Sequence, residues 1–321
     1  MIIFSARKRR IRLLEKLGIQ RVTIDLPFKL NHVHCFLAEG ENGWKIIDTG
    51  LHNEKSIKAW SPHLEDKKIT DLIITHCHPD HIGYAGQLQL ETGASVWMSE
   101  TDAELSHILW ADAAREELIS RYVKCGVDPD TVKQISQLKE PLIYPLPVIS
   151  GYLNEGDKIR FGKYEYEVIF TPGHSDGLFV LFNREKKVLL STDHILPKIT
   201  PNISLRVLEE SNPLDCYFRS LLKIKTLDIE YAIPSHGDPF FDVHNRIEEI
   251  ESHHQERLEF ILNLLEQPKT AVQVCEQLFR KNLTMHELRF AIGETLSHLV
   301  YLINKGLCRK NEMDGKWYYF K

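Results

Sequence analysis

The chain has 321 residues, of which 43% are hydrophobic, so it can bury a large core, and its length favours one large domain with a smaller one. Its formal net charge of −5 excludes a basic surface over the whole chain, the feature that a polyanion-binding protein presents. The charge is uneven: residues 1–12 sum to +5 and residues 268–321 to +4, which leaves a charge of −14 on the residues between them.

The six cysteines are widely scattered and form no C-x-x-C pair, which favours reduced thiols over a disulfide framework. The basic first twelve residues are not followed by the apolar stretch of a secretory signal. No apolar run approaches the roughly 20 residues that a membrane span needs. We therefore expect a cytoplasmic protein with no membrane partner.

The first third of the chain predicts a series of β-strands, short runs rich in branched and aromatic residues that Pro, Gly or Asn interrupt. These runs are residues 21–27, 33–39, 44–50, 71–75 and 94–100. Residues 101–124 then carry apolar side chains at three- and four-residue spacings, so a helix is predicted there, with Thr101 and Glu104 as its capping box. A second, short helix is expected near residues 131–138.

Further strands are expected in the second half of the chain, separated by turns with Gly or Asn. They are residues 157–162, 164–173, 177–182, 187–193 and 231–237. The apolar stripe of residues 242–266 predicts one long helix after them. Pro268 ends this helix and marks the best domain boundary.

The tail predicts a small unit of its own. Thr270 with Gln273 and Thr284 with Glu287 are two capping boxes, each of which opens a helix. The second helix is followed by two short strand-like runs around the turn "MDG". Helix, helix and hairpin is the order of a winged-helix module, which we expect over residues 268–321.

The stretch "THCHPDHIG", residues 75–83, places three histidines and an aspartate in one short turn directly after an apolar strand. Three more histidine or aspartate residues also follow apolar strands: His174, Asp193 and His236. Imidazole and carboxylate are the donors that zinc or another borderline divalent ion prefers. Because strand ends in a layered sheet structure point to one rim, these distant residues can converge on a metal.

The motif H-x-H-x-D-H resembles that of the metallo-β-lactamase fold hydrolases, and "DTG", "TPGHSDG", "STDH" and "PSHG" resemble the remaining motifs of that superfamily in the same order. The resemblance covers roughly residues 20–240. It implies an α/β (α+β) fold, an αββα sandwich with a dinuclear metal centre on one edge. We expect a catalytic domain over residues 1–241 with a helical insertion at about 101–140, a connecting helix at 242–267, and the winged-helix-like domain.

The resemblance also implies a role for each motif residue. The first metal would be held by His76, His78 and His174. The second would be held by Asp80, His81 and His236. Asp193 would bridge both ions, as in the glyoxalase II-like branch, and this argues against antibiotic hydrolysis because true β-lactamases of this fold usually lack it. Asp48 would orient the ligand loop or a ligating imidazole.

The expected cofactors are two divalent metal ions, zinc by preference, with iron or manganese as alternatives because imidazole and carboxylate suit all three. Two cations about 3.5–4 Å apart can share a water and lower its pKa, so that hydroxide attacks a carbonyl or phosphorus centre. Asp80 and Asp193 are the expected catalytic residues, because their charge holds the ions together and can accept a hydrogen bond from the nucleophile.

Other residues near the motifs leave alternatives open. His194 follows Asp193 and is expected beside the ligands or in the pocket wall. Tyr84 stands where many relatives have glycine, so its ring either faces the substrate or packs in the interior. The remaining histidines singled out by their spacing are expected to be structural or, in the last two cases, solvated: His32, His34, His253 and His254.

We expect hydrolysis of a small thioester, ester or lactone. One alternative is a metal-dependent ribonuclease or phosphodiesterase, but the acidic central region would repel a phosphate chain. The other is a nucleic-acid-binding regulatory protein. Its recognition helix would offer Arg289 and Lys305 but also Glu287 and Glu294, so the tail is read as a structural cap or homodimer element. The expected partner is a small-molecule substrate, and nucleic acid stays open.

Overall fold

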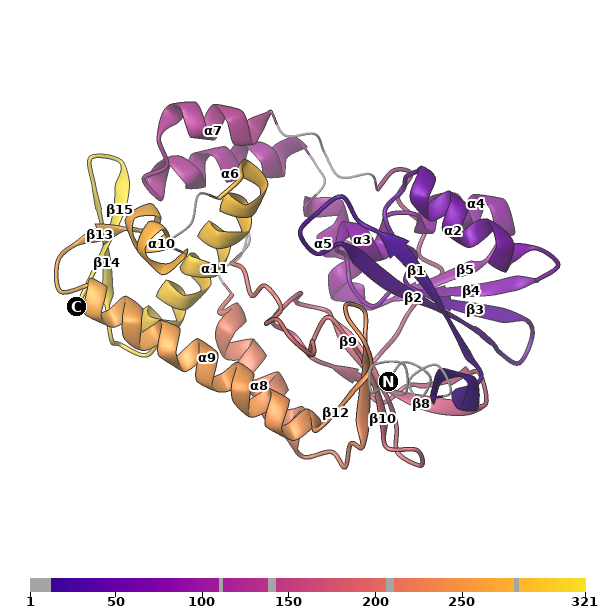
Figure 1. The fold of residues 1–321 in the computed structure, drawn as a ribbon. Helices are drawn as coiled ribbons and strands as arrows, with labels where there is room; N and C mark the ends of the chain where they lie inside the picture. The colour runs from indigo at the N-terminus through magenta and orange to yellow at the C-terminus, as the bar shows by residue number, and fades with distance from the viewer. Residues whose placement is uncertain (1–12, 110–111, 138–142, 206–210, 280–282) are drawn as a thin grey trace, which may run out of the picture. The chain divides into compact units, whose positions relative to one another are not determined.

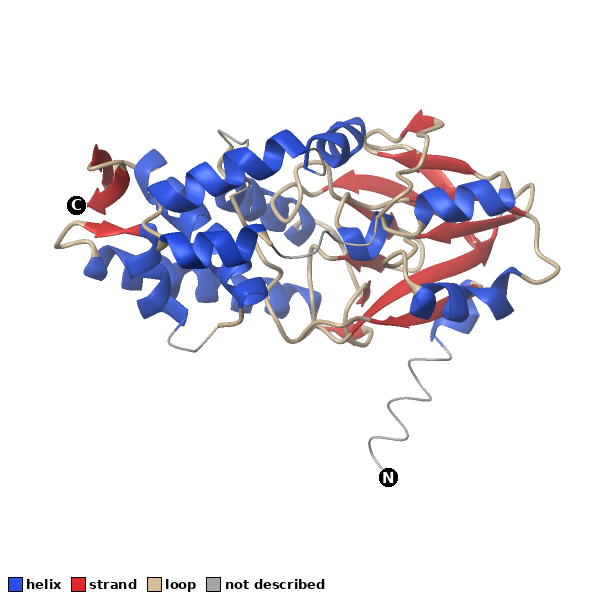
Figure 2. Ribbon diagram, turned by 90° about the horizontal axis from the view of Figure 1, so that it is seen from above, coloured by secondary structure: helices blue, strands red, loops and turns tan. Residues whose placement is uncertain are grey.

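The computed structural model describes residues 13–109, 112–137, 143–205, 211–279 and 283–321 (Figure 1). The chain forms two compact units. Unit 1 comprises Met1–Ser106, Pro141–Pro201 and Lys225–Arg246, and unit 2 comprises His107–Glu140, Asn202–Ile224 and Ile247–Lys321. Most strands belong to unit 1, whereas unit 2 is mainly helical (Figure 2). The domain boundaries expected from the sequence stay a prediction.

The first sheet of unit 1 has six strands in sequence order. They are β1 (Ile19–Asp25), β2 (His32–Glu39), β3 (Trp44–Ile47), β4 (Ile69–Ile73), β5 (Ser95–Met98) and β6 (Gly151–Tyr152). β1, β2 and β3 pair antiparallel, and β3 to β6 pair parallel. The parallel half gives β3 and β4 a shared carboxyl-terminal edge.

The second sheet of unit 1 also has six strands, in the order β12-β11-β10-β9-β8-β7. They are β7 (Lys158–Phe161), β8 (Tyr164–Phe170), β9 (Phe179–Asn183), β10 (Val188–Thr192), β11 (Tyr231–Pro234) and β12 (Phe240–Phe241). β8 and β10 are each antiparallel to β9, and β10 is parallel to β11. Strands β8, β10 and β11 therefore all end at the same edge.

The core of unit 1 draws on both sheets. Phe36 and Ile47 come from the first sheet, and Phe161, Phe179 and Leu181 come from the second, all within one buried cluster. Burial of each such side chain stabilises the fold by roughly 1.5–3 kcal/mol. Two sheets packed through an apolar layer, with helices outside, confirm the α/β sandwich expected from the motifs.

Helices cover the first sheet, where α2 (Glu54–Leu64) contacts β1 and α4 (Ala85–Thr92) contacts β4 and β5. The short α3 (Pro79–Ile82) lies in the histidine-rich motif. The predicted capping box of Thr101 and Glu104 is wrong, because α5 (Glu100–Leu109) begins earlier. Ser99, directly after β5, accepts the Asp102 N–H at 3.3 Å, so this hydroxyl caps the helix before Thr101 can.

Unit 2 contains the remaining helices and a three-stranded sheet in the order β13-β15-β14. The helices are α6 (Asp112–Lys124), α7 (Pro129–Ser136), most of α8 (Pro213–Lys225) and α9 (Val243–Leu264), α10 (Ala271–Phe279) and α11 (Met285–Asn304). The strands are β13 (Lys269–Thr270), β14 (Arg309–Met313) and β15 (Lys316–Phe320). The predicted helix over 101–124 corresponds to α5 and α6, and positions 110–111 lie outside the described residues.

Both capping boxes predicted in the tail are confirmed. The Thr270 N–H donates to Gln273 Oε1 at 2.9 Å, and the Gln273 N–H donates back to Thr270 Oγ1 at 3.3 Å. Thr284 and Glu287 form the same reciprocal pair at the start of α11. The order of helix, helix and hairpin is present, while the winged-helix assignment stays a prediction. Among the described helices, none has the length and apolar character to cross a lipid bilayer.

Candidate metal centre

The motif residues follow strands that end at common edges of the two sheets. His174, Asp193 and His236 come after β8, β10 and β11, which all point the same way in the second sheet. The H-x-H-x-D-H loop follows β4 of the first sheet. Because the sheets face each other through the core, turns from both can meet at one end of the sandwich.

The loop holds its shape through a short helix. His78 is the N-cap of α3 in an extended conformation, and Pro79 occupies the first helical position, where its fixed φ suits the helix. The N–H groups of His81 and Ile82 both donate to the His78 carbonyl, at 2.9 and 3.0 Å. Pro79 therefore makes the chain turn between His78 and His81, and each of these imidazoles falls in a group with His76.

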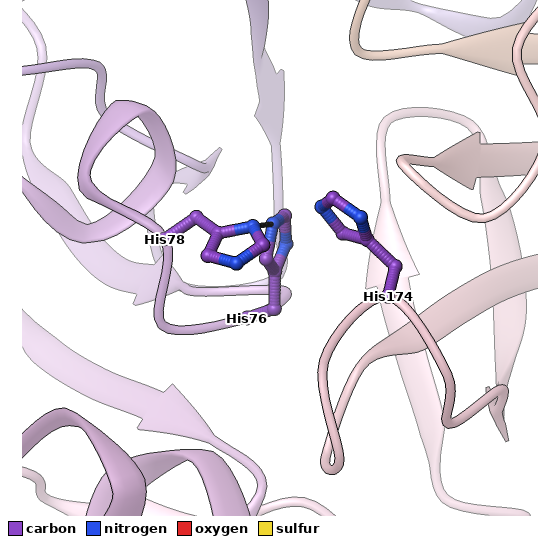
Figure 3. A group of neighbouring side chains, drawn as sticks. All are labelled: His76, His78 and His174. Atoms are coloured by element: carbon purple, nitrogen blue, oxygen red, sulfur yellow. Dashed lines mark hydrogen bonds between the residues drawn. The ribbon is translucent and has the colours of Figure 1, made fainter. Parts of the chain in front are cut away.

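His76, His78 and His174 form the first group (Figure 3). His76 and His78 project from one loop, and His174 faces them from the turn after β8. The facing nitrogens of His76 and His78, Nε2 and Nδ1, are 2.9 Å apart, and the ring centroids of His78 and His174 are 4.4 Å apart. One ligand atom from each residue lies within 4.8 Å of the others, which is the spacing of a metal's coordination shell.

Asp80, His81 and His236 form a second group of the same kind, and Asp193 lies between the groups. The Oδ2 atom of Asp193 is 3.2 Å from Nε2 of His236, 3.5 Å from Nε2 of His81 and 3.4 Å from Nε2 of His174. Asp80 Oδ2 is 3.5 Å from the same His236 nitrogen. One carboxylate oxygen thus faces imidazoles from both groups, the position that a bridging ligand needs.

The donor set fits a divalent cation. Within the part of the chain that the structure describes, His81 Nε2, His236 Nε2 and Asp193 Oδ1 are buried and make no hydrogen bond. Buried polar atoms without partners are rare in folded proteins, and several at one point call for a missing partner. A cation among imidazoles and carboxylates would satisfy these atoms together, and this donor chemistry suits zinc.

The electrostatics of the centre also favour positive charge. Burial lowers the pKa of His81, but the carboxylates of Asp48 and Asp193 outweigh burial and hold that pKa well above its ordinary value. Burial likewise lowers the pKa of His236, and Asp193 raises it on balance. Burial raises the pKa of Asp193, but His236 and His81 bring it well below its ordinary value. The carboxylates that raise these imidazole pKa values would attract a divalent cation for the same electrostatic reason.

Asp48 holds one of these imidazoles in position through hydrogen bonds. Its Oδ2 accepts a hydrogen bond from His81 Nδ1 at 2.8 Å, and its Oδ1 accepts the Thr75 N–H at 2.9 Å. With its proton on Nδ1, His81 presents the lone pair of Nε2 to the centre. Asp48 and Thr192, the residue before Asp193, both have positive φ, at 57° and 46°, a conformation that few residues other than glycine adopt.

Comparison with known families decides the assignment. Residues 29–236 match the metallo-beta-lactamase superfamily, and residues 258–321 match the family described as metallo-beta-lactamase-like, C-terminal domain. The chain belongs to the metallo-β-lactamase superfamily. This confirms the resemblance drawn from the five motifs.

Relatives of this superfamily member differ in how much of the chain they share. The "Probable metallo-hydrolase YqjP" of Bacillus subtilis is 27% identical, over 87% of this chain and 90% of its own. The "Hydroxyacylglutathione hydrolase GloC" of Haemophilus influenzae is 26% identical over 52% of this chain and 69% of its own. The first relative shares most of the chain, whereas the second shares about half of it.

Two solved structures resemble the fold along nearly the whole chain. A beta-lactamase domain protein from Burkholderia ambifaria is 30% identical with a TM-score of 0.86, covering 95% of this chain and 92% of its own. A metallo-beta-lactamase family protein from Thermus thermophilus is also 30% identical, with a TM-score of 0.83 and coverage of 95% and 98%. Both structures extend the likeness to the tail.

In this superfamily member, the sequence did not reveal two residues that hold the motif loops. The carbonyl of His32 accepts a hydrogen bond from His236 Nδ1 at 2.6 Å, and its ring Nε2 accepts the Gly237 N–H at 2.9 Å. A backbone acceptor leaves no mark in the sequence, so no signal could have found it. The carboxylate of Asp102 accepts the Cys77 N–H at 2.8 Å. The sequence predicted a helix capped by Thr101, but α5 begins at Glu100, and this error concealed the role of Asp102.

The other residues singled out from the sequence fall in the interior. His194 is fully buried beside Asp193. Tyr84 is buried in unit 1, and its hydroxyl donates to Glu91 Oε2 at 3.1 Å. The expectation that His254 is solvated is wrong, because its ring lies in the core of unit 2 with Nδ1 3.1 Å from His298 Nε2. Its neighbour His253 is half-buried.

Proposed function

We propose that the chain is a metal-dependent hydrolase with two divalent metal ions, zinc by preference. The first ion would be held by His76, His78 and His174. The second would be held by Asp80, His81 and His236, with Asp193 shared. The observation that carries the proposal is the position of Asp193 Oδ2, within 3.2–3.5 Å of imidazole nitrogens from both groups.

Bound divalent cations supply Lewis acidity, which lowers the pKa of water and polarises a carbonyl group. The residues of this chain contribute orientation and proton handling. Asp80 and Asp193 turn Oδ2 toward the centre, so either carboxylate can accept the proton that an attacking water gives up. The Asp48 carboxylate keeps the proton of His81 on Nδ1 and so keeps Nε2 free to act as a ligand.

We propose a small thioester, ester or lactone as the substrate. The bridging aspartate of the glyoxalase II-like pattern supports acyl cleavage, and so does the likeness to the Haemophilus influenzae protein named as a hydroxyacylglutathione hydrolase. The Bacillus subtilis relative, named as a probable metallo-hydrolase, supports the broader class. The charge of −14 between the two basic ends favours a small uncharged or weakly charged acyl group over a phosphate chain.

Metal analysis of the purified protein, followed by a screen of thioesters, lactones and esters, tests the proposal. We expect two metal equivalents per chain and turnover of at least one acyl substrate, lost by roughly 100-fold or more in His78→Ala because a metal ligand is removed. His107→Ala, at an exposed histidine, is the matched control and should keep full turnover. A wild-type protein without bound metal, or a fully active His78→Ala variant, contradicts the proposal.

A further inference from the structure

Asp102 is a buried carboxylate that the centre described above does not use directly. It lies in the first turn of α5, its side chain is fully buried, and it forms no ion pair with any residue that the structure describes. A buried charge without a cationic partner is costly unless hydrogen bonds compensate for lost hydration. The hydrogen-bond donors around this carboxylate therefore indicate its structural role.

Its hydrogen bonds join two separate segments. Oδ2 accepts the Cys77 N–H at 2.8 Å, and Oδ1 accepts the Gly177 N–H at 2.7 Å. The Ser175 hydroxyl lies 2.8 Å from Oδ1 and 2.7 Å from Oδ2, so it can donate to either oxygen. Cys77 stands between His76 and His78, and Ser175 directly follows His174. One carboxylate thus contacts both loops that carry the first histidine group.

Close packing fixes the carboxylate in this position. A Cβ atom on Gly177 would lie 2.8 Å from the Asp102 amide nitrogen and 2.9 Å from its Oδ1, so only glycine allows this approach. The Ser99 hydroxyl accepts the Asp102 N–H and anchors the same turn of α5. The carboxylate cannot shift without moving one of the two loops.

We propose that Asp102 is a positioning residue that sets the separation of the His76–His78 loop and the His174 loop, and so the affinity of the first metal site. The inference rests on the proposed function, since it concerns how that centre is assembled. A carboxylate is needed because all three neighbouring groups are donors. An asparagine would turn its NH₂ group toward either the Cys77 or the Gly177 amide and push that loop away.

The test compares wild type with Asp102→Asn, using chelator competition and the visible absorption spectrum of the cobalt(II)-substituted protein. We expect one of the two metal equivalents to bind roughly 10- to 100-fold more weakly, with an altered cobalt spectrum for that equivalent. The other equivalent should keep its affinity. Asp71→Asn is the matched control. Asp71 of β4 accepts a hydrogen bond from Trp97 Nε1 of β5 at 2.8 Å, but it does not bond to either histidine loop.

Several outcomes overturn the inference. Wild-type affinity and an unchanged cobalt spectrum in a folded Asp102→Asn protein show that the carboxylate does not position the ligands, and equal losses in Asp71→Asn show a general effect. If Asp102→Asn does not fold, Ser175→Ala is the second variant, because it removes the hydroxyl contact beside His174 and leaves the Gly177 amide to hold that loop to Asp102, so we expect weaker metal binding. Unchanged metal affinity in Ser175→Ala then contradicts the proposal. A wild-type protein that binds no metal overturns the proposed function, and this inference with it.

Discussion

The Oδ2 atom of Asp48 lies 2.8 Å from Nδ1 of His81, and both side chains are fully buried. The pair joins the end of β3 to the short helix α3, two segments that adjoin in space because β3 and β4 are parallel neighbours. A buried carboxylate that faces an imidazole fixes which ring nitrogen carries the proton. The relationship therefore determines which nitrogen of His81 is available at the centre.

Substitution of Asp48 should weaken metal binding without abolishing it. In Asp48→Ala, the Thr75 N–H loses its acceptor, and no carboxylate keeps the proton of His81 on Nδ1. We therefore expect roughly 10- to 100-fold lower metal affinity. The orphaned amide should also lower the free energy of unfolding by about 1–3 kcal/mol. Chelator competition and urea unfolding measure the two effects. Asp25→Ala, at an exposed strand end, is the control, and equal losses there would contradict this role for Asp48.

Removal of the shared carboxylate should change metal stoichiometry. We expect Asp193→Ala to bind fewer than two equivalents, because its Oδ2 faces both groups and its negative charge reduces the repulsion between two cations. Elemental analysis after desalting gives the ratio. Asp228→Ala is the control, since Asp228 is an exposed carboxylate paired with Lys187. Two full equivalents in Asp193→Ala would refute a bridging role.

The stability of unit 2 should fall in weak acid because of the His254–His298 pair. Burial lowers the pKa of His298 from 6.5 to about 4, and burial followed by the charge of His298 lowers that of His254. Such groups bind protons more readily in the unfolded chain, so the unfolding free energy falls as pH drops through 6.5 and levels off below about 4. For His298 alone the total loss is about 3 kcal/mol.

Thermal unfolding between pH 7.5 and 5 checks this dependence against a His254→Gln/His298→Gln variant. The other ionisable groups around the pair, His253, Arg257 and Glu294, are the same in both proteins, so the difference in slope isolates the two imidazoles. We expect a shallower slope in the variant and an unchanged metal content, because the metal-site residues belong to unit 1. Equal slopes would show that the pair does not titrate as described.

Tyr84 should contribute to stability but not to turnover. Its ring is buried in unit 1 and its hydroxyl donates to Glu91, so Tyr84→Phe removes a hydrogen bond and little else. We expect a loss of about 0.5–1.5 kcal/mol in unfolding free energy, with kcat and KM unchanged. Steady-state kinetics with an acyl substrate found in the screen provide the measurement. A KM shift in the folded variant would favour a substrate-facing ring.

The sequence could predict most of the sandwich and the convergence of its motif residues for one physical reason. Residues that follow parallel strands share a sheet edge, so the ends of β8, β10 and β11 had to place His174, Asp193 and His236 together. The two capping boxes of the tail were equally readable, because both partners of each box lie within four residues of each other. Short-range capping patterns and the direction of the strands therefore account for the parts of the fold and site that were predicted correctly.

The failures came where a residue's surroundings are set by distant segments or by competing signals. His254 continues the buried stripe of Ile250, Leu258 and Ile261, but its polar side chain suggested solvent. In the structure the His298 ring supplies a partner, so burial becomes tolerable. Asp102 was missed because two hydroxyl residues compete to cap α5, and the bonds to Cys77 and Gly177 cross long stretches of chain.

Asp48 and Thr192 both adopt left-handed backbone geometry at the rim where the strands end. For residues with a side chain, each such conformation costs of the order of 1–3 kcal/mol. Thermal stability and metal binding consequently make opposing demands on Asp48. Selection for stability would favour glycine at both positions, whereas selection for metal binding would retain Asp48, whose carboxylate holds His81.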